Sequence, residues 1–385
     1  MLPNGWKKVK IKDIKSVDIQ NGFSPLCVDY ETKRKSLSLG SLTGFSLDVS
    51  QQKNISENVV MPIHSLLKRN DILVSRSNTK DKVGRAAVVL DDLKEIYYPD
   101  LMMRFQVNEK IADSQFVALC LQSPSGRGYF ESHAAGTSTS MVKINKGVLE
   151  NFSMLLPPIG EQKKIAATLS VWDSAIEKME KLIEFKESQK KSLIKKLIEK
   201  QEEKAIKVGN VTIDKNKWKH ERIGNVLKIG HGRDYKGLSL GKVPVFGSGG
   251  YMTSVDKFLH DGETVCIGRK GTIDKPFYYK GKIWTVDTLF YTYDFKNVIP
   301  KFIYYVFCSI PWKIKNEAGG VPSLTSKIVE NVEFYSPSLP EQQIIVDVLS
   351  NADEEIFLLK QQLENYKKQK QGLMQKLLTG QWRVK

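Results

Sequence analysis

The chain has 385 residues, four cysteines and a formal net charge of +16 at pH 7. Its length gives room for roughly two to four domains with cores of their own. No apolar run is long enough to cross a bilayer and the segment Met1–Lys15 is rich in lysine, so we expect neither a membrane span nor a signal peptide. The cysteines form no Cys-x-x-Cys pair, which favours reduced thiols in the cytoplasm over disulfides or a structural zinc site.

The first block of the chain, residues 1–156, has the pattern of short strands separated by Gly-, Ser- and Asp-rich turns. Strands are predicted at Ile72–Ser75 and Met103–Phe105, and a helix is predicted at Phe116–Gln122. The first of these strands leads into a polar, basic loop, Arg76–Arg85. We therefore expect a mixed α/β domain with its most basic loop at a strand end.

A long amphipathic helix is predicted in the next segment, residues 157–205, with the helix itself taken as 161–205. Pro157-Pro158 precede a Glu161-Gln162 start, and no proline follows. Apolar or long side chains then recur at alternating spacings of four and three residues, which is the period of a coiled-coil seam. The seam positions are Ile165, Leu169, Trp172, Ile176, Met179, Ile183, Lys186, Lys190, Leu193 and Leu197. Such a helix would be about 60 Å long.

The second block, residues 206–336, resembles the first more faintly. Strands are predicted at Val265–Gly268 and Phe290–Thr292, and a helix at Phe302–Cys308. The first of these strands again ends at an arginine, which opens the loop Arg269–Lys275. The two blocks therefore share a predicted scaffold, whereas their loops differ.

The last segment, residues 337–385, repeats the first long helix at an offset of 180 residues, from Glu161-Gln162 to Glu341-Gln342. Its seam is Ile345, Leu349, Ala352, Ile356, Leu359, Leu363, Tyr366, Lys370, Leu373 and Leu377. A repeat of this length predicts two copies of one unit, a globular block followed by a helix. Because the linker after the first helix is short, we expect the two helices to pack antiparallel. The predicted fold class is α+β with a pseudo-two-fold internal repeat.

The charge is concentrated in the globular blocks. The helical segments 161–205 and 341–385 carry +2 and +1, so the blocks 1–160 and 206–340 hold about +13 of the total +16. A basic surplus on folded blocks is typical of nucleic-acid binders. A generally lysine-rich proteome is the alternative explanation.

Candidate DNA contacts are the charged, amide, hydroxyl and imidazole side chains of the loops between strands. Arg and Lys can bind guanine acceptors, Asn can pair with adenine, and Lys, Ser or Thr can hold phosphates. Each could instead be a solvated surface residue. The candidates are Arg76, Asn78, Lys80, Lys82, Arg85, Ser138, Thr139, His231, Arg233, Arg269, Lys270, Thr272, Lys275, Ser323, Thr325 and Lys327.

Catalytic motifs are not apparent in the sequence. It contains no GxxxxGK[ST] loop, no Asn-Pro-Pro-aromatic motif and no metal-ligand spacing among its five histidines. We therefore expect no catalytic residue, no metal site and no cofactor, and interpret the chain as a protein that binds rather than an enzyme.

Four motifs resemble one known family. They are Leu156-Pro157-Pro158-Ile159-Gly160-Glu161-Gln162, its second copy Pro337-Ser338-Leu339-Pro340-Glu341-Gln342, the stretch Val243–Gly250 and the ending Lys376–Arg383. With these motifs and its two-copy organisation, the chain resembles the specificity subunit of type I restriction-modification enzymes.

The resemblance implies two target-recognition domains, 1–156 and 206–336, that each read one half of an asymmetric, split site in double-stranded DNA. It implies that the helical segments act as a spacer and dock two methyltransferase subunits, which restriction or motor subunits join for cleavage. S-adenosylmethionine, ATP and magnesium would then belong to those partners, in the cytoplasm and away from membranes. The implied stalk and partner-binding residues are Glu161, Gln162, Leu169, Ile176, Ile183, Leu193, Leu197, Glu341, Gln342, Leu349, Ile356, Leu363, Leu373 and Leu377.

Two other functions fit parts of the pattern. A stand-alone regulator with two DNA-binding domains would bind operators tightly without partners. A structural coiled-coil protein would show no salt-dependent affinity for duplex DNA.

Overall fold

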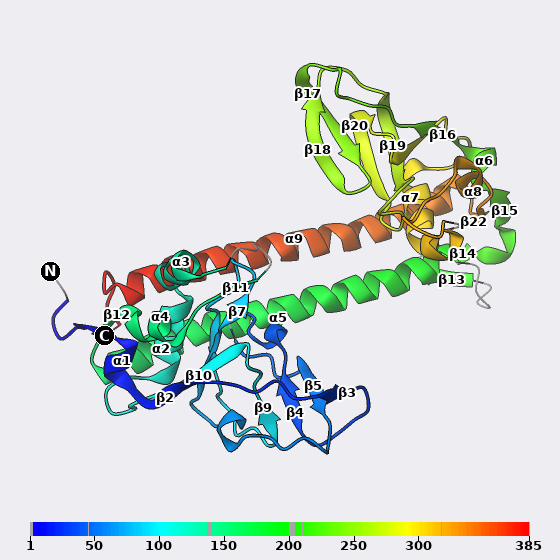
Figure 1. Cartoon of the computed structure of the whole chain (residues 1–385). Coiled ribbons are helices and arrows are strands. Elements are labelled where there is room, and N and C mark those ends of the chain that lie inside the picture. The colour runs from blue at the N-terminus through cyan, green and yellow to red at the C-terminus, as the bar shows by residue number, and fades with distance from the viewer. Residues whose placement is uncertain are drawn as a thin grey trace. The chain divides into compact units, whose positions relative to one another are not determined.

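The structure is a computed structural model that describes residues 3–44, 46–136, 141–199, 205–209, 211–316 and 318–384. It divides into two compact units, which we describe separately: unit 1 is Met1–Glu180 with Gln361–Lys385, and unit 2 is Lys181–Lys360. The chain has two helices of 40 residues, α5 (Ile159–Ile198) and α9 (Leu339–Leu378) (Figure 1). Each of these helices is divided between the two units, so each unit contains a part of both.

Outside the long helices, the described residues of unit 1 form short strands with four short helices and two 3-10 turns. These are β1 (Lys7–Lys10), α1 (Ile11–Ile14), β2 (Lys15–Asn21), β3 (Cys27–Val28), β4 (Lys35–Leu37), η1 (Leu39–Ser41), β5 (Gln52–Ile55), η2 (Ile63–Ser65), β6 (Ile72–Ser75), β7 (Ser77–Asn78), β8 (Ala86–Val88), β9 (Ile96–Tyr97), β10 (Met102–Val107), α2 (Ser114–Gln122), α3 (Pro124–His133), β11 (Val142–Lys143), α4 (Lys146–Asn151) and β12 (Ser153–Leu156). The strands predicted at Ile72–Ser75 and Met103–Phe105 and the helix predicted at Phe116–Gln122 are confirmed.

Two four-stranded sheets form the body of unit 1, in the orders β2-β10-β6-β8 and β3-β5-β4-β9. One face of the first sheet packs on α2, which begins where the Asp113 side chain accepts a hydrogen bond from the Phe116 N–H. The other face is covered by the second sheet, since Leu37 and Leu42 pack against Leu73. Both faces of the first sheet are therefore buried.

Unit 2 has one large sheet. Its elements outside the long helices are β13 (Ala205–Val208), β14 (Val211–Asp214), η3 (Lys215–Lys217), β15 (Lys219–Arg222), α6 (Ile223–Val226), β16 (Lys228–His231), β17 (Leu240–Gly247), β18 (Gly250–Val255), β19 (His260–Gly268), β20 (Phe277–Thr285), β21 (Leu289–Tyr293), α7 (Pro300–Ser309), η4 (Trp312–Lys315), α8 (Ser326–Glu330) and β22 (Glu333–Ser336). Six strands join in the order β16-β21-β19-β20-β17-β18. The predicted strands and helix of this block are confirmed.

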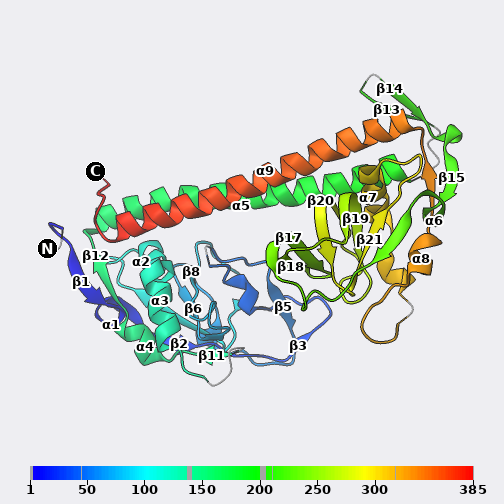
Figure 2. The same cartoon turned by 90° about the horizontal axis from the view of Figure 1, so that it is seen from above.

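The two faces of this six-stranded sheet differ. Helix α7 packs against β19 and β20 from the side on which Val265 and Ile267 join the core (Figure 2). On the other face, Cys266 is covered by aromatic side chains of the sheet itself, which include Phe246, Phe277, Tyr279 and Tyr291. Aromatic side chains therefore cover this face of the sheet in unit 2, whereas a second sheet covers the corresponding face in unit 1.

In unit 1 the beginning of α5 runs antiparallel to the end of α9. Ion pairs join Asp173 to Lys370 and Glu180 to Lys367, so residue numbers rise along one helix as they fall along the other. At the end of this helix pair, Arg383 donates hydrogen bonds to both carboxylate oxygens of Glu161, at 2.5 and 2.8 Å.

In unit 2 the end of α5 runs antiparallel to the beginning of α9. Lys190 pairs with Asp353, and Lys186 pairs with Glu355 at 2.6 Å. Helix α5 ends at Ile198 rather than at the predicted residue 205, and β13 begins at Ala205.

Most predicted seam residues are buried as expected. Leu169, Ile176, Ile183, Leu197, Leu349, Ile356, Leu363 and Leu377 are buried, whereas Leu193 and Leu373 are half-buried. The neighbouring Ile194 and Met374 are buried in their place. These contacts confirm the predicted fold class, a repeated α/β domain joined by long antiparallel helices.

A buried glutamine ties each globular domain to its helix pair. In unit 1 the Gln162 Oε1 accepts a hydrogen bond from the Asp113 N–H at 2.8 Å, and its Nε2 donates to the carbonyls of Ile111 and Pro157 at 2.9 and 2.8 Å. Gln342 makes the corresponding bonds in unit 2. Because buried polar groups need partners, the Gln of each Glu-Gln motif fixes how the helix leaves its domain.

The two glutamates of the motif act differently. Glu341 accepts hydrogen bonds from the N–H and hydroxyl of Ser338, as in a capping box. The first copy has Pro158 at that position, which has no N–H to donate. Glu161 instead accepts from Trp6 Nε1 at 3.2 Å and from Arg383.

Candidate nucleic-acid interface

The predicted loop of unit 1 is held at its base by an arginine. Arg76 donates from Nη1 to the carbonyl of Asp100 at 3.3 Å, and its N–H bonds to the carbonyl of Leu101. Asn78 lies in β7, which pairs with β11. Arg76 and Asn78 are half-buried, so backbone contacts fix where this loop leaves the sheet.

The remaining candidates of that loop separate into two groups. Lys80 and Lys82 are exposed, as phosphate contacts require. Arg85 is half-buried and donates to the carbonyl of Thr43 at 3.1 Å, which directs it toward the helix side of unit 1. The Arg85 N–H bonds to the carbonyl of Lys82 at 3.1 Å, but the Arg85 side chain is engaged by Thr43, whereas the two lysines are exposed.

In unit 2 the equivalent loop uses the same anchor. Arg269 donates from Nη1 to the carbonyl of Asp287 at 3.3 Å, which matches the bond between Arg76 and Asp100 in unit 1. The Arg269 side chain is nevertheless exposed. An arginine that is positioned at one nitrogen can still offer its other donors to a ligand.

Loops of unit 2 converge beside this arginine. Lys270 forms a β-bridge with Ser323, and the Gly271 N–H donates to the carbonyl of Pro322 at 2.8 Å. Asp274 is paired with Lys313 at 2.9 Å, and this ammonium holds the pKa of the Asp274 carboxyl below its ordinary value.

The other candidates of these loops are mostly at the surface. Lys275, Thr325 and Lys327 are exposed, and Thr272 is half-buried. Thr325 caps α8, since its hydroxyl accepts from the Ile328 N–H at 3.2 Å. Its hydroxyl therefore has a structural role already.

The predicted segment His231–Arg233 of unit 2 also lies beside Arg269. The Arg233 N–H donates to the carbonyl of Thr285 at 2.8 Å, and the carbonyl of Arg233 accepts from Trp284 Nε1 at 2.9 Å. The Arg269 N–H donates to Thr288 on the same turn, also at 2.8 Å. Arg233 and Arg269 thus flank the turn between β20 and β21. The exposed His231 packs edge-on against Phe290 in the adjoining strand.

A further segment, not among the predicted contacts, completes this cluster. The tight turn Gly247–Gly250 between β17 and β18 places Ser248 against the loop, where a Cβ on Gly271 would lie 3.3 Å from the Ser248 Oγ. Tyr251 and Met252 follow this turn and are 63% and 51% exposed. The glycine-rich run in the sequence was the available indication, since glycines allow close backbone approach. We call Arg233, Ser248, Arg269, Lys270 and Ser323 the loop cluster of unit 2.

Two predicted contacts of unit 1, Ser138 and Thr139, lie outside the residues that the structure describes. They fall between α3 and β11, and β11 pairs with β7 of the Arg76 loop. Their assignment remains a prediction.

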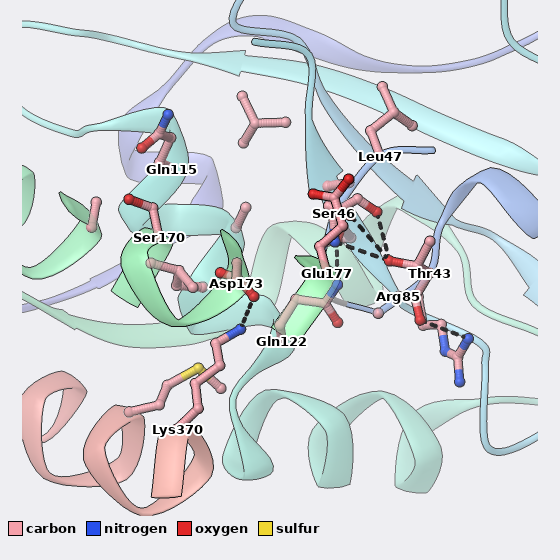
Figure 3. Close-up of a pocket in the computed structure, with 18 of the residues that line it drawn as sticks. Thr43, Ser46, Leu47, Arg85, Gln115, Gln122, Ser170, Asp173, Glu177 and Lys370 are labelled. Atoms are coloured by element: carbon pink, nitrogen blue, oxygen red, sulfur yellow. Dashed lines mark hydrogen bonds and ion pairs between the residues drawn. The ribbon is translucent and has the colours of Figure 1, made fainter. Parts of the chain in front are cut away.

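A pocket of about 790 Å³ lies in unit 1 between the globular domain and the helix pair. Figure 3 shows the ion pair of Asp173 and Lys370 on one side of it, with Thr43, Ser46 and Arg85 on the other. Lys370 is only 4% exposed. Burial raises the pKa of Asp173, against the opposing effect of the Lys370 ammonium. This pocket lies between the helices and the domain, and Asp81 and Arg85 of the Arg76 loop line it, whereas Lys80 and Lys82 do not.

Among the described residues no group of histidine, cysteine and carboxylate side chains could hold a metal ion. The four cysteines are free, and burial raises the pKa of Cys120 and Cys266. A search of the same residues finds no helix that is long and apolar enough to span a membrane.

Comparison with known proteins identifies one family. The model of the type I restriction modification DNA specificity domain matches residues 3–187 and 215–366. The type I restriction enzyme MjaVIII specificity subunit of Methanocaldococcus jannaschii is 24% identical over 322 residues, covering 74% of this chain and 74% of that protein.

Two solved structures are similar over nearly the whole chain. The S subunit of a type I restriction-modification system from M. genitalium has a TM-score of 0.61 at 18% identity, covering 98% of both chains. A protein from a study of complex assembly and conformational transition in the type I R-M system has a TM-score of 0.59 at 14% identity, with the same coverage. At these identities the likeness shows a shared fold.

The two segments that match the family model contain both Glu-Gln motifs, both buried glutamines and both arginine-anchored loops. The chain therefore belongs to the family of type I restriction-modification DNA specificity subunits.

Proposed function

We propose that this chain selects the DNA sequence on which a type I restriction-modification complex acts, with each globular domain reading one half of a split site. One observation carries the proposal. Four segments distant in the sequence bring Arg233, Ser248, Arg269, Lys270 and Ser323 together at one end of the unit 2 sheet. Exposed guanidinium and ammonium groups beside glycine-rich turns suit contact with bases and phosphates.

An asymmetric target follows from the difference between the two loops. The Arg76 loop of unit 1 offers an amide at Asn78 and ammonium groups at Lys80 and Lys82, whereas the Arg269 loop offers a guanidinium and Lys270. Asparagine suits adenine and arginine suits guanine in the major groove. The long helices would set the gap between the half-sites, since a duplex repeats every ~10 base pairs.

We propose two methyltransferase subunits as the partners of the helices, with restriction or motor subunits added for cleavage. Buried seam residues hold the helices together, so a partner must contact their remaining faces. Apolar side chains exposed on the long helices include Val171, Phe185, Phe357 and Leu358. S-adenosylmethionine, ATP and magnesium would be bound by the partners, and the complex would act in the cytoplasm.

A DNA-binding titration across salt tests this function. We expect the affinity of the chain for duplex DNA to fall steeply between 50 and 200 mM salt, and to rise when the methyltransferase is present. The change to test is Lys270→Ala with Lys275→Ala. If both lysines contact phosphates, the slope of log affinity against log salt becomes less negative by roughly 0.9 for each.

The matched control removes two exposed lysines from other sheets of unit 2, Lys207→Ala with Lys219→Ala. This control changes the net charge equally, so its salt slope should stay near that of the wild type. Equal slopes in the two double variants would exclude the loop cluster as the DNA contact. Tight, specific binding without any methyltransferase would favour a stand-alone regulator.

A further inference from the structure

The two long helices carry one repeat, so each residue of α5 has an equivalent 180 positions later in α9, as Glu161 has Glu341. Four of the ion pairs between the helices form two equivalent sets, and each set has one pair in each unit. Comparing these sets shows which contacts the two repeats share and which distinguish them.

One set is the same in both repeats. Asp173 pairs with Lys370 in unit 1, and Asp353 pairs with Lys190 in unit 2. Asp173 and Asp353 are equivalent positions, as are Lys190 and Lys370. Each helix thus contains both members of the pair, so this contact would form equally well between two copies of the same helix.

A second set has its charges reversed. Glu180 of α5 pairs with Lys367 of α9 at 2.9 Å in unit 1, and Glu187 of α5 pairs with Lys360 of α9 at 2.5 Å in unit 2. Glu180 is equivalent to Lys360, and Glu187 is equivalent to Lys367. Helix α5 therefore carries both glutamates, and α9 carries both lysines.

Pairing of like helices would place like charges together. Two copies of α5 in the same antiparallel register would bring Glu180 of one copy to Glu187 of the other, at two places. Two copies of α9 would bring Lys360 to Lys367 in the same way. Charges at such flanking positions decide which helices of a coiled coil choose each other, and like charges there disfavour association.

We propose that these four residues form a pairing code, which makes each repeat associate with the unlike repeat and disfavours association of two identical ones. The shared Asp–Lys pairs set the register, and Glu180, Glu187, Lys360 and Lys367 set the identity of the partner. In a protein with two different recognition domains, the code keeps the two unlike domains together. That consequence for DNA rests on the proposed function, whereas the code itself does not.

A neighbouring set of contacts also differs between the repeats. In unit 1 the ring of Trp172 meets that of Tyr366 edge to face, at 5.9 Å between centroids. The equivalent positions in unit 2 are Ala352 and Lys186, and Lys186 is paired with Glu355 at 2.6 Å. Pairing of like helices would lose this edge-to-face contact, so it favours the same choice of partner.

The size of the effect follows from exposure. The four side chains of the code are 28% to 54% exposed, so each ion pair alone contributes little. Two α5–α9 pairs contain four attractive ion pairs of the code. If they exchange into one α5–α5 pair and one α9–α9 pair, these four attractions are replaced by four repulsions. We therefore expect the ratio of unlike to like helix pairs to fall by at least about tenfold when the code is removed.

One double variant removes the choice and keeps the native contacts. Glu187→Lys with Lys360→Glu reverses a single ion pair, so unlike pairing retains two attractions and the net charge is unchanged. Like pairing also becomes attractive, because each helix then carries one glutamate and one lysine at the positions of the code. The single variants Glu187→Lys and Lys360→Glu are the controls. Each of them places two like charges at the contact between positions 187 and 360.

The experiment starts from the intact chain with a protease site inserted between Glu199 and Ala205. After folding, the chain is cut, and native mass spectrometry follows the pairing of its two halves. For the wild type we expect only unlike pairs. For the double variant we expect both like pairs, raised by at least about tenfold. Like pairs at equal levels in both proteins would overturn the code.

Thermal denaturation of the uncut chains gives a second reading. Each single variant should melt below the wild type, and the double variant should regain the wild-type melting temperature. Failure of the double variant to recover would also overturn the proposal, because the two residues would then not be coupled. This measurement decides the matter even where the cut halves precipitate.

Discussion

Replacing Gln342 with leucine should destabilise unit 2 by about 3 to 5 kcal/mol, since each buried group left without a partner costs about 1–3 kcal/mol. The Gln342 Oε1 accepts from the Ile299 N–H at 2.8 Å, and its Nε2 donates to the carbonyls of Pro337 and Asn297 at 3.0 and 3.3 Å. Leucine has similar size and satisfies none of these groups. Chemical denaturation with hydrogen exchange on unit 2 measures the loss.

The adjacent Gln343 provides the control. It is exposed and bonds only along its own helix, to Asp347 at 2.7 Å, among the contacts that the structure describes. Gln343→Leu should therefore change stability by less than about 0.5 kcal/mol. Equal losses in the two variants would show that the buried carboxamide does not fix the helix to its domain.

Replacing Lys370 with methionine should cost about 2 to 3 kcal/mol at pH 7, because it removes the cation beside a largely buried carboxylate. Asp173 is 21% exposed, and its pKa is raised by burial even with Lys370 present. Without that ammonium, the ionised form of Asp173 is less favourable in the folded protein. Denaturant unfolding of wild type and variant measures the difference.

The pH dependence of this loss follows from the direction of the shift. A carboxyl whose pKa is raised by folding favours the folded state while protonated, and that benefit disappears as pH rises through its folded-state pKa. The Lys370→Met deficit should therefore shrink toward acidic pH. Adding Asp173→Leu should recover most of it at pH 7, since apolar replacement of a buried pair is often nearly neutral. A deficit that grows in acid, or persists in the double variant, would contradict this explanation.

The long helices and their pairing could be predicted from the sequence because a heptad period is a local pattern. The first helix was extended too far, since the residues after Ile198 are good helix formers and no proline or glycine ends it. The second helix has Gly380 just beyond its end at Leu378. Since the two helices repeat at an offset of 180 residues, the position equivalent to Leu378 is Ile198, where the first helix ends.

The assembly of the candidate interface could not be predicted in the same way. Arg233, Ser248 and Ser323 meet only because β16, β17 and the segment before α8 reach one end of a sheet, and strand order is not written in any local pattern. Likewise, the hydrogen bond from Arg85 to the carbonyl of Thr43 joins residues that are far apart in the sequence, so no local pattern indicates it. Residue type indicated which side chains could bind DNA, but the sheet decides which of them lie together.

The most direct test of two unlike domains reading one split site is a map of methylated adenines in cells that express this chain with its methyltransferase. We predict a two-part motif whose second half changes when the loop Arg269–Lys275 is replaced, while the first half and the gap stay the same. A motif that is unaffected by the replacement, or that changes in both halves at once, would contradict the account.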